Sequence, residues 1–142
     1  MAYEMSREQY RAFLLEGTRT AKVATTRADG SPHLAPVWFV LDGADLVFTT
    51  GADSVKGRTL RRDPRVGICV DDEHPPFAFV TVEGVAELST DLGALRHYAT
   101  AIGERYMGAD QAEAFGARNG VPGELLVRVR PTRVVARAGI AD

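Results

Sequence analysis

One segment of the chain combines several groups that bind anions. Residues 49–66 read TTGADSVKGRTLRRDPRV, in which a β-branched run ends at Gly51 and residues suited to capping a helix follow. Lys56 and Arg58 come in the opening turn of the helix that this pattern predicts, where free amides and the helix dipole already favour negative charge. Together with the Ser54 hydroxyl, these groups suit a phosphate monoester or diester.

The same segment also has a purely structural explanation. Basic residues on a short helix usually form a solvated face, and serine is common at helix starts for structural reasons alone. However, the positive charge is concentrated in this segment, since the net charge of the whole chain is −2. Its cations are Lys56, Arg58, Arg61, Arg62 and Arg65. From spacing alone, both explanations stay open.

Length and composition narrow the class of protein. With 142 residues, 45% of them hydrophobic, the chain is long enough for one domain with its own core and too short for two of ordinary size. Its charge lacks the overall basicity of a typical nucleic-acid binder. The lone Cys69 forms no internal disulfide, and we see neither a signal peptide nor an apolar stretch of about 20 residues that could span a bilayer. We expect a single domain over residues 1–142, cytoplasmic, that binds neither nucleic acid nor membrane.

The histidines and the serine do not form a recognisable catalytic or metal-binding pattern. His33 falls in a predicted hairpin, His74 in a polar loop and His97 on a predicted helix, and their spacing is not that of metal ligands. No histidine and carboxylate accompany Ser54 in the order of a hydrolase triad. We therefore expect no metal ion, and the sequence assigns no catalytic residue.

Turn residues divide the chain into many short strands and a few helices. A hairpin is predicted from strands at 20–26 and 32–41, and an antiparallel sheet of six to seven strands follows from the later runs. The other strands are expected at 46–50, 65–71, 77–88, 124–130 and 132–137, and the helices at 6–17, 54–63, 90–107 and 110–118. This order predicts an α+β fold, whose closure into a small barrel would hide the sheet edges. It argues against a Rossmann fold, and no GxGxxG motif occurs.

Three parts of the sequence resemble one known family. They are the hairpin ATTRADGSPHLAPVWFV (24–40), the segment 49–66 and the strand FVTVEGVAEL (79–88). They are similar to the flavin- and deazaflavin-binding split β-barrels related to pyridoxamine 5′-phosphate oxidase. The combination of DGSPH and PVWF with SxK and RxLRRDPR most resembles the actinobacterial branch that binds coenzyme F420, an 8-hydroxy-5-deazaflavin, rather than FMN. The resemblance implies a mostly antiparallel split β-barrel with peripheral helices.

The resemblance also implies which residues bind the cofactor. The middle of the second strand would lie beside the ring system, the end of the third beneath the ribityl chain, and the start of the helix against the phosphate. These residues are Pro36, Val37, Trp38, Thr49, Thr50, Gly51, Ser54, Lys56, Arg58 and Arg61. Without the resemblance, Trp38 would equally be a residue of the barrel core.

Two further features follow from the resemblance. F420 carries an oligoglutamate tail, and Arg61, Arg62 and Arg65 would offer it a cationic track, unless Arg62 and Arg65 pair with Asp63. The site would lie at the interface of a homodimer, where Phe77 would reach the cofactor or substrate from the partner chain. His33 is a candidate substrate contact, although a histidine next to a turn is often structural.

The implied activity is that of a reductase. It would transfer hydride from reduced F420 to a conjugated planar acceptor such as a quinone or tetrapyrrole. One alternative is an FMN-dependent oxidase or reductase of the pyridoxamine-phosphate oxidase type, although the chain lacks a C-terminal arginine and histidine arrangement for that substrate. Another is a non-catalytic carrier of F420, haem or another tetrapyrrole.

Overall fold

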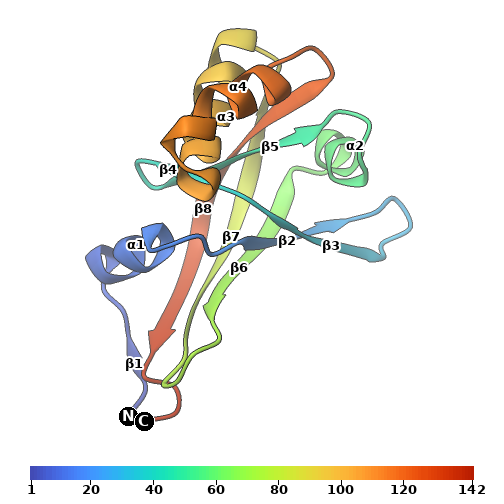
Figure 1. The fold of residues 1–142 in the computed structure, drawn as a ribbon. Coiled ribbons are helices and arrows are strands. Elements are labelled where there is room, and N and C mark those ends of the chain that lie inside the picture. Colours follow the sequence, from blue (N-terminus) through green and yellow to red (C-terminus); the bar gives the residue numbers. More distant parts are fainter.

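The structure, a computed structural model, describes residues 1–142 as an antiparallel sheet with four α-helices around it (Figure 1). The strands are β1 (Tyr3–Glu4), β2 (Ala21–Thr26), β3 (Pro32–Val37), β4 (Val40–Asp42), β5 (Asp45–Gly51), β6 (Arg65–Asp72), β7 (Ala78–Ser89) and β8 (Glu124–Ala138). The helices are α1 (Arg7–Leu15), α2 (Val55–Arg62), α3 (Leu92–Met107) and α4 (Ala112–Asn119), with a 3-10 turn, η1 (Ala109–Gln111), before α4. The predicted α+β class is confirmed. No helix has the length and apolar character needed to span a membrane.

The order of the strands shows how the sheet closes. Neighbouring strands follow the order β3-β2-β6-β7-β8-β5-β4, and β1 adds to β8. The two ends of this series, β3 and β4, are separated in sequence only by Trp38 and Phe39. Because two residues span only a short distance, the two sheet edges have to lie next to each other. The sheet is therefore rolled into a barrel with a seam between β3 and β4, which is the split β-barrel that the resemblance implies.

Several predicted boundaries were wrong. The run 32–41 is two strands, because strand pairing is interrupted at Trp38 and Phe39: β3 pairs with β2, whereas β4 pairs with β5. The strands predicted at 124–130 and 132–137 form the single strand β8. This strand continues through Pro131 because it bulges there. The bulge lies opposite Gly84, and a Cβ atom on Gly84 would come within 2.7 Å of the Arg130 carbonyl oxygen.

Two other differences concern the ends of elements. The helix predicted at 90–107 begins later, because Asp91 caps α3: the Asp91 carboxylate accepts a 2.9 Å hydrogen bond from the Ala94 amide. Strand β1 was not predicted, because two residues carry no periodicity. The helix predicted at 6–17 is confirmed as α1, which begins with a capping box of reciprocal hydrogen bonds between Ser6 and Gln9.

The barrel interior holds the main hydrophobic core. Alternate residues of the strands point inward, and α1 adds Phe13 and Leu14 while α2 adds Leu60. Among the side chains with the least exposure are Phe39, Phe48, Val23, Val80 and Val127. Burying each such side chain stabilises the fold by about 1.5 to 3 kcal/mol. A second, smaller core forms outside the barrel, where Leu95 of α3 packs on Val47 and Leu126.

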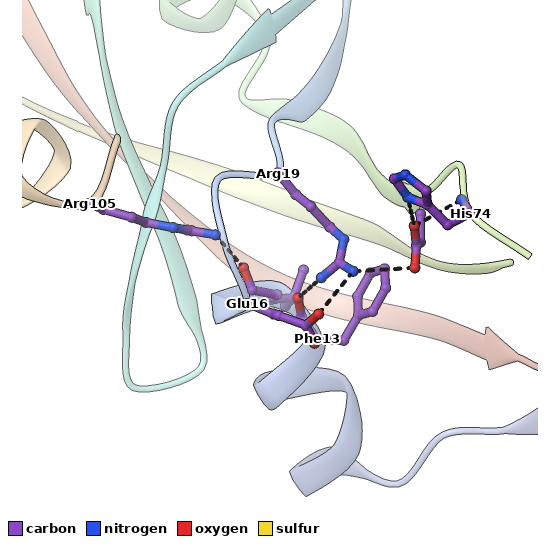
Figure 2. Close-up of polar contacts among 7 residues, drawn as sticks. Phe13, Glu16, Arg19, His74 and Arg105 are labelled. Atoms are coloured by element: carbon purple, nitrogen blue, oxygen red, sulfur yellow. Dashed lines mark hydrogen bonds and ion pairs between the residues drawn. The ribbon is translucent and has the colours of Figure 1, made fainter. Parts of the chain in front are cut away.

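Two arginines join α1 to the rest of the barrel (Figure 2). Arg19 donates to the Phe13 carbonyl at 2.9 Å and contacts Asp72 at 3.3 Å, and Asp72 also bonds His74. Hydrogen bonds from the His74 amide and ring hold the pKa of the Asp72 carboxyl below its usual value. Arg105, from α3, donates to the Leu14 carbonyl at 2.7 Å. The end of α1, the β6–β7 turn and α3 are thereby fixed relative to one another.

Candidate functional site

An open cleft of about 270 Å³, which we call the seam cleft, lies where the barrel seam meets the helices. Its walls come from the link between β3 and β4, the end of β5, the start of α2, and the helices α3 and α4. The lining residues are Pro36, Val37, Trp38, Thr49, Thr50, Lys56, Ile102 and Asn119. The first six of these belong to the residues that the sequence predicts to bind one cofactor. The structure therefore brings residues from three separate segments into one cleft.

The start of α2 is held tightly against the end of β5. The Ser54 hydroxyl donates to the Gly51 carbonyl at 2.7 Å, accepts from the Gly57 amide at 3.0 Å, and lies 3.0 Å from the Thr50 hydroxyl. These three bonds use the full capacity of a hydroxyl group. Ser54 therefore acts as the cap of α2, and its hydroxyl leaves no position for a ligand in this structure.

Glycine is required at position 57 by this close approach. A Cβ atom there would lie 2.4 Å from the carbonyl oxygen of Gly51 and 2.8 Å from that of Ala52. Both neighbours are backbone atoms, which cannot move aside as the end of a side chain can. The absence of a side chain at Gly57 thus lets α2 begin directly beneath the β5 terminus and brings Lys56 to the cleft.

The cations of α2 differ in their partners. Lys56 is half-buried in the cleft wall, Arg58 and Arg61 are exposed, and none of the three forms an ion pair. Arg62 donates to the Thr26 carbonyl. Lys56, Arg58 and Arg61 therefore carry the positive charge that no acid of the chain compensates.

Arg65 pairs with Asp63, which is the alternative to a role in binding the cofactor tail. Its guanidinium forms two bonds to Asp63, at 3.0 and 2.8 Å. These bonds, with the Arg65 amide, lower the pKa of the Asp63 carboxyl to about 2. Arg62 does not join this pair. The cationic track expected from Arg61, Arg62 and Arg65 is reduced to Arg61 in this structure, with Arg58 one turn before it.

Trp38 forms an aromatic wall of the cleft instead of filling the barrel. The adjacent Phe39 points into the core, whereas 37% of Trp38 is exposed. The Tyr106 ring stacks on the indole with the centroids 5.0 Å apart, and Phe115 contacts it at 5.7 Å. The Tyr106 hydroxyl donates to the Arg19 carbonyl at 2.7 Å and accepts from the Phe39 amide at 3.2 Å. Helices α3 and α4 therefore hold the indole in place.

His33 and Phe77 do not line the cleft of their own chain. His33 lies on β3 opposite Thr25, and the His33 Nδ1 and Thr25 Oγ1 atoms are buried without hydrogen-bond partners. Burial lowers the pKa of His33, and the charges of Arg27 and Lys56 lower it further. Phe77 lies in the turn between β6 and β7, and Figure 1 shows this turn near the chain termini. The Phe77 carbonyl accepts a hydrogen bond from the Ile140 amide at 3.2 Å.

Sequence reasoning missed the contribution of α3 and α4 to the cleft. Ile102 and Asn119 line it, but nothing in their local sequence marks them. The sequence does carry one signal for this packing, which is a glycine in each of the two helices. A Cβ atom on Gly103 would lie 2.6 Å from Phe115 Cβ, and one on Gly116 would lie 2.0 Å from the Thr100 hydroxyl. Glycines inside two consecutive helices indicate close helix packing, which here places α4 against α3 and both against Trp38.

Glu124 gives a pH-dependent prediction. It pairs with Gly51 at the start of β8, its Oε2 atom is buried without a partner, and burial raises the pKa of its carboxyl. The folded state thus binds this proton more tightly than the unfolded chain, so stability falls as the pH rises above the ordinary value of 4.5. Glu124→Gln should have a higher thermal midpoint than the wild type at neutral pH, by a margin that shrinks on acidification. Glu113→Gln, at an exposed position of α4, is the matched control, and an equal response of both variants would contradict the prediction.

Comparison with known proteins assigns the chain to a family. The family model described as pyridoxamine 5′-phosphate oxidase matches residues 6–138. A conserved hypothetical protein from Mycobacterium tuberculosis is 28% identical, with a TM-score of 0.84, over 95% of this chain and 86% of that one. A protein described as an F420 reductase is 30% identical, with a TM-score of 0.67, over 87% of this chain and 94% of that one. A FAD-binding protein from Mesorhizobium loti, 19% identical over 96% of each chain, shares the fold with a TM-score of 0.71. The chain belongs to the pyridoxamine 5′-phosphate oxidase family and has its flavin-binding split-barrel fold.

Proposed function

We propose that the protein is a coenzyme F420-dependent oxidoreductase that reduces a conjugated planar acceptor such as a quinone or a tetrapyrrole. The observation that carries this proposal is the composition of the seam cleft. It combines an exposed aromatic wall at Trp38, two hydroxyl side chains at Thr49 and Thr50, and a cation without an acid partner at Lys56. The 30% identity to an F420 reductase supports F420 as the cofactor.

The cleft fits the three parts of a deazaflavin cofactor. Pro36, Val37 and Trp38 would hold the planar ring. The end of β5, where Thr49 and Thr50 line the cleft and Gly51 follows them, would hold the ribityl chain. The phosphate would lie against Lys56 at the start of α2, where the helix dipole adds to the positive charge. Arg58 and Arg61, which have no acid partner, would face the negative tail that F420 has and FMN lacks.

When bound, reduced F420 would supply a hydride to the acceptor. The chain itself would bind and orient the cofactor and exclude water from it, which are the usual contributions of a protein to cofactor chemistry. Lys56 is the one ionisable residue in the lining of the cleft, and its place in the proposal is the phosphate. The proposed mechanism therefore assigns no acid or base to this chain.

We further propose that the protein is a homodimer with the cofactor site at its interface. On the outer sheet face of β2, β6, β7 and β8, small, half-buried residues stand side by side in cross-strand rows, which also hold the charged residues Lys22, Glu83 and Arg133. The small, half-buried residues include Ala24, Gly67, Cys69, Thr81 and Val135, beside Leu34, which is 67% exposed. A second copy covering this face would give the open cleft another wall, which in the proposal includes Phe77 of the partner. Gly67→Arg should convert a dimer to a monomer in sedimentation, and a wild-type monomer would contradict the proposal.

Lys56→Ala should weaken F420 binding by about 1 to 3 kcal/mol, because it removes a charge-assisted contact in a partly desolvated cleft. This corresponds to a Kd that is about 5- to 150-fold higher. Arg65→Ala is the matched control, since Arg65 already pairs with Asp63 and lies outside the cleft. Isothermal titration of the three proteins with F420 gives the comparison. An unchanged Kd in Lys56→Ala would contradict the role assigned to this residue.

Activity is tested by following the oxidation of reduced F420 with a panel of quinones and tetrapyrroles. The proposal predicts that at least one acceptor is reduced, at a rate that falls in Lys56→Ala at subsaturating F420. Tight F420 binding without turnover across the panel would instead indicate a carrier.

A further inference from the structure

A second cavity, of about 230 Å³, lies beneath α1 and shares no lining residue with the seam cleft. Its walls come from α1, the β4–β5 turn, β7 and β8. The apolar part is lined by Tyr10, Leu14, Leu41, Leu46, Val82 and Val134. Tyr10, Leu41 and Val134 are only partly buried, although they pack against the main core. The cavity is therefore an apolar space that continues from the barrel interior to the surface.

The cavity exists because β8 extends past β5. The two strands pair only as far as Leu46 and Val129, after which the bulge at Pro131 changes the course of β8. Strand β1 pairs with β8 again only at Arg137 and Ala138. Between these points no strand covers this edge of β8, and α1 lies across the gap without filling it.

Positive charge is concentrated at the mouth of this cavity. On α1 the residues Arg7, Tyr10, Arg11 and Leu14 follow the spacing of one helix face, so two arginines stand on the face that meets an apolar space. An adjoining hollow of about 300 Å³ shares Arg7 and Tyr10 with the cavity and adds Arg130 and Arg133.

Most of these arginines have no acid partner. Arg130 pairs with Glu87 at 2.8 Å, and Asp45, the acid that lines the hollow, contacts Arg128 at 3.3 Å. Arg7, Arg11 and Arg133 form no ion pair, and Arg11 donates to the Gly43 carbonyl. The mouth therefore offers uncompensated guanidinium groups to a ligand with a negative head.

We infer that this cavity binds a free medium-chain fatty acid, with its alkyl chain among the apolar residues and its carboxylate against Arg7 and Arg11. An apolar cavity of about 150 Å³ is enough to bind benzene, so a larger one accommodates a segment of alkyl chain. Guanidinium groups bind carboxylates through paired, charge-assisted hydrogen bonds. The site is independent of the proposed cofactor cleft, since the two cavities have no lining residue in common.

Calorimetric titration of the full-length protein with decanoate, decanol and decyltrimethylammonium tests this inference. Decanoate should bind about tenfold more tightly than the alcohol, and the cation should not bind. The double variant Arg7→Gln/Arg11→Gln should bind decanoate as weakly as the wild type binds decanol, with its decanol affinity unchanged. Both arginines are exposed, so this variant should keep the thermal midpoint of the wild type. Val134→Phe, which places a larger side chain in the cavity, should abolish binding of both ligands.

A control separates the two cavities. Saturating F420 and the Lys56→Ala variant should leave decanoate binding unchanged. Loss of decanoate binding under either condition would place the fatty acid in the seam cleft and overturn the inference. Equal affinities for decanoate and decanol, or unchanged decanoate binding in both the double arginine variant and Val134→Phe, would overturn it as well.

Discussion

Replacing Gly57 with alanine is expected to lower the free energy of unfolding by about 3 kcal/mol. The new methyl group would lie within 2.8 Å of two backbone carbonyl oxygens, those of Gly51 and Ala52. To relieve this contact, α2 would have to move away from the end of β5. Because Lys56 lies on the same turn of α2, the variant should also bind F420 more weakly. Urea unfolding followed by the fluorescence of Trp38, the single tryptophan, measures the first effect, and calorimetry measures the second.

Gly93→Ala provides the matched control. Gly93 is also near the start of a helix, but a Cβ atom there meets nothing closer than 3.6 Å. Helix propensity alone predicts that this change stabilises α3 by about 0.5 to 1 kcal/mol. The difference between the two variants isolates the backbone contact at Gly57. If Gly57→Ala were as stable as Gly93→Ala, the tight packing of α2 against β5 would be wrong.

Replacing Arg105 with alanine should destabilise the protein by about 3 kcal/mol. Its half-buried guanidinium donates to three carbonyl groups, those of Leu14 at 2.7 Å, Gly17 at 3.1 Å and Phe39 at 2.7 Å. It also lies over the ring of Phe39, 4.6 Å from the centroid. The variant leaves the part-buried carbonyls of Leu14 and Phe39 without this donor. It also removes the bonds that connect α3 to α1 and to the barrel seam. The fluorescence of Trp38 should change at the same time, since its neighbour Phe39 loses this bond.

The control for Arg105 is Arg118→Ala on α4. Arg118 is exposed, and its guanidinium forms no hydrogen bond but lies 5.7 Å from the centroid of the Phe115 ring. Its removal should change the free energy of unfolding by less than about 0.5 kcal/mol. Arg105→Lys keeps the charge but cannot reach three separate carbonyls, so it should resemble the alanine variant. Full stability of Arg105→Lys would show that charge, and not the three bonds, matters at this position.

Local chemistry was enough to predict the elements that carry the candidate site. The change from a β-branched run to glycine and then to a serine cap predicts the end of β5 and the start of α2, and both lie where the sequence places them. The turn at Ala28–Ser31 similarly defines the β2–β3 hairpin. Such signals depend on residues a few positions apart, whose geometry the sequence specifies directly.

Contacts between distant segments could not be predicted in the same way. The break at Trp38 and Phe39 depends on closure of the barrel, in which β3 pairs with β2 and β4 pairs with β5. Between these strands the Phe39 ring is buried, whereas the Trp38 ring is partly exposed. Serine is a residue type that often binds phosphate, but all three hydrogen bonds of the Ser54 hydroxyl go to other groups of the chain. The contribution of Asn119 depends on how α4 packs, which the sequence of α4 alone does not specify.

The most direct test of the proposed cofactor is to titrate the purified protein separately with F420 and with FMN and to follow binding by calorimetry and by quenching of Trp38 fluorescence. The proposal predicts that F420 binds more tightly than FMN and that Lys56→Ala weakens this binding while Arg65→Ala does not. Micromolar binding of FMN with none of F420 would contradict the choice of cofactor, and binding of neither would contradict the assignment of the seam cleft as a cofactor site.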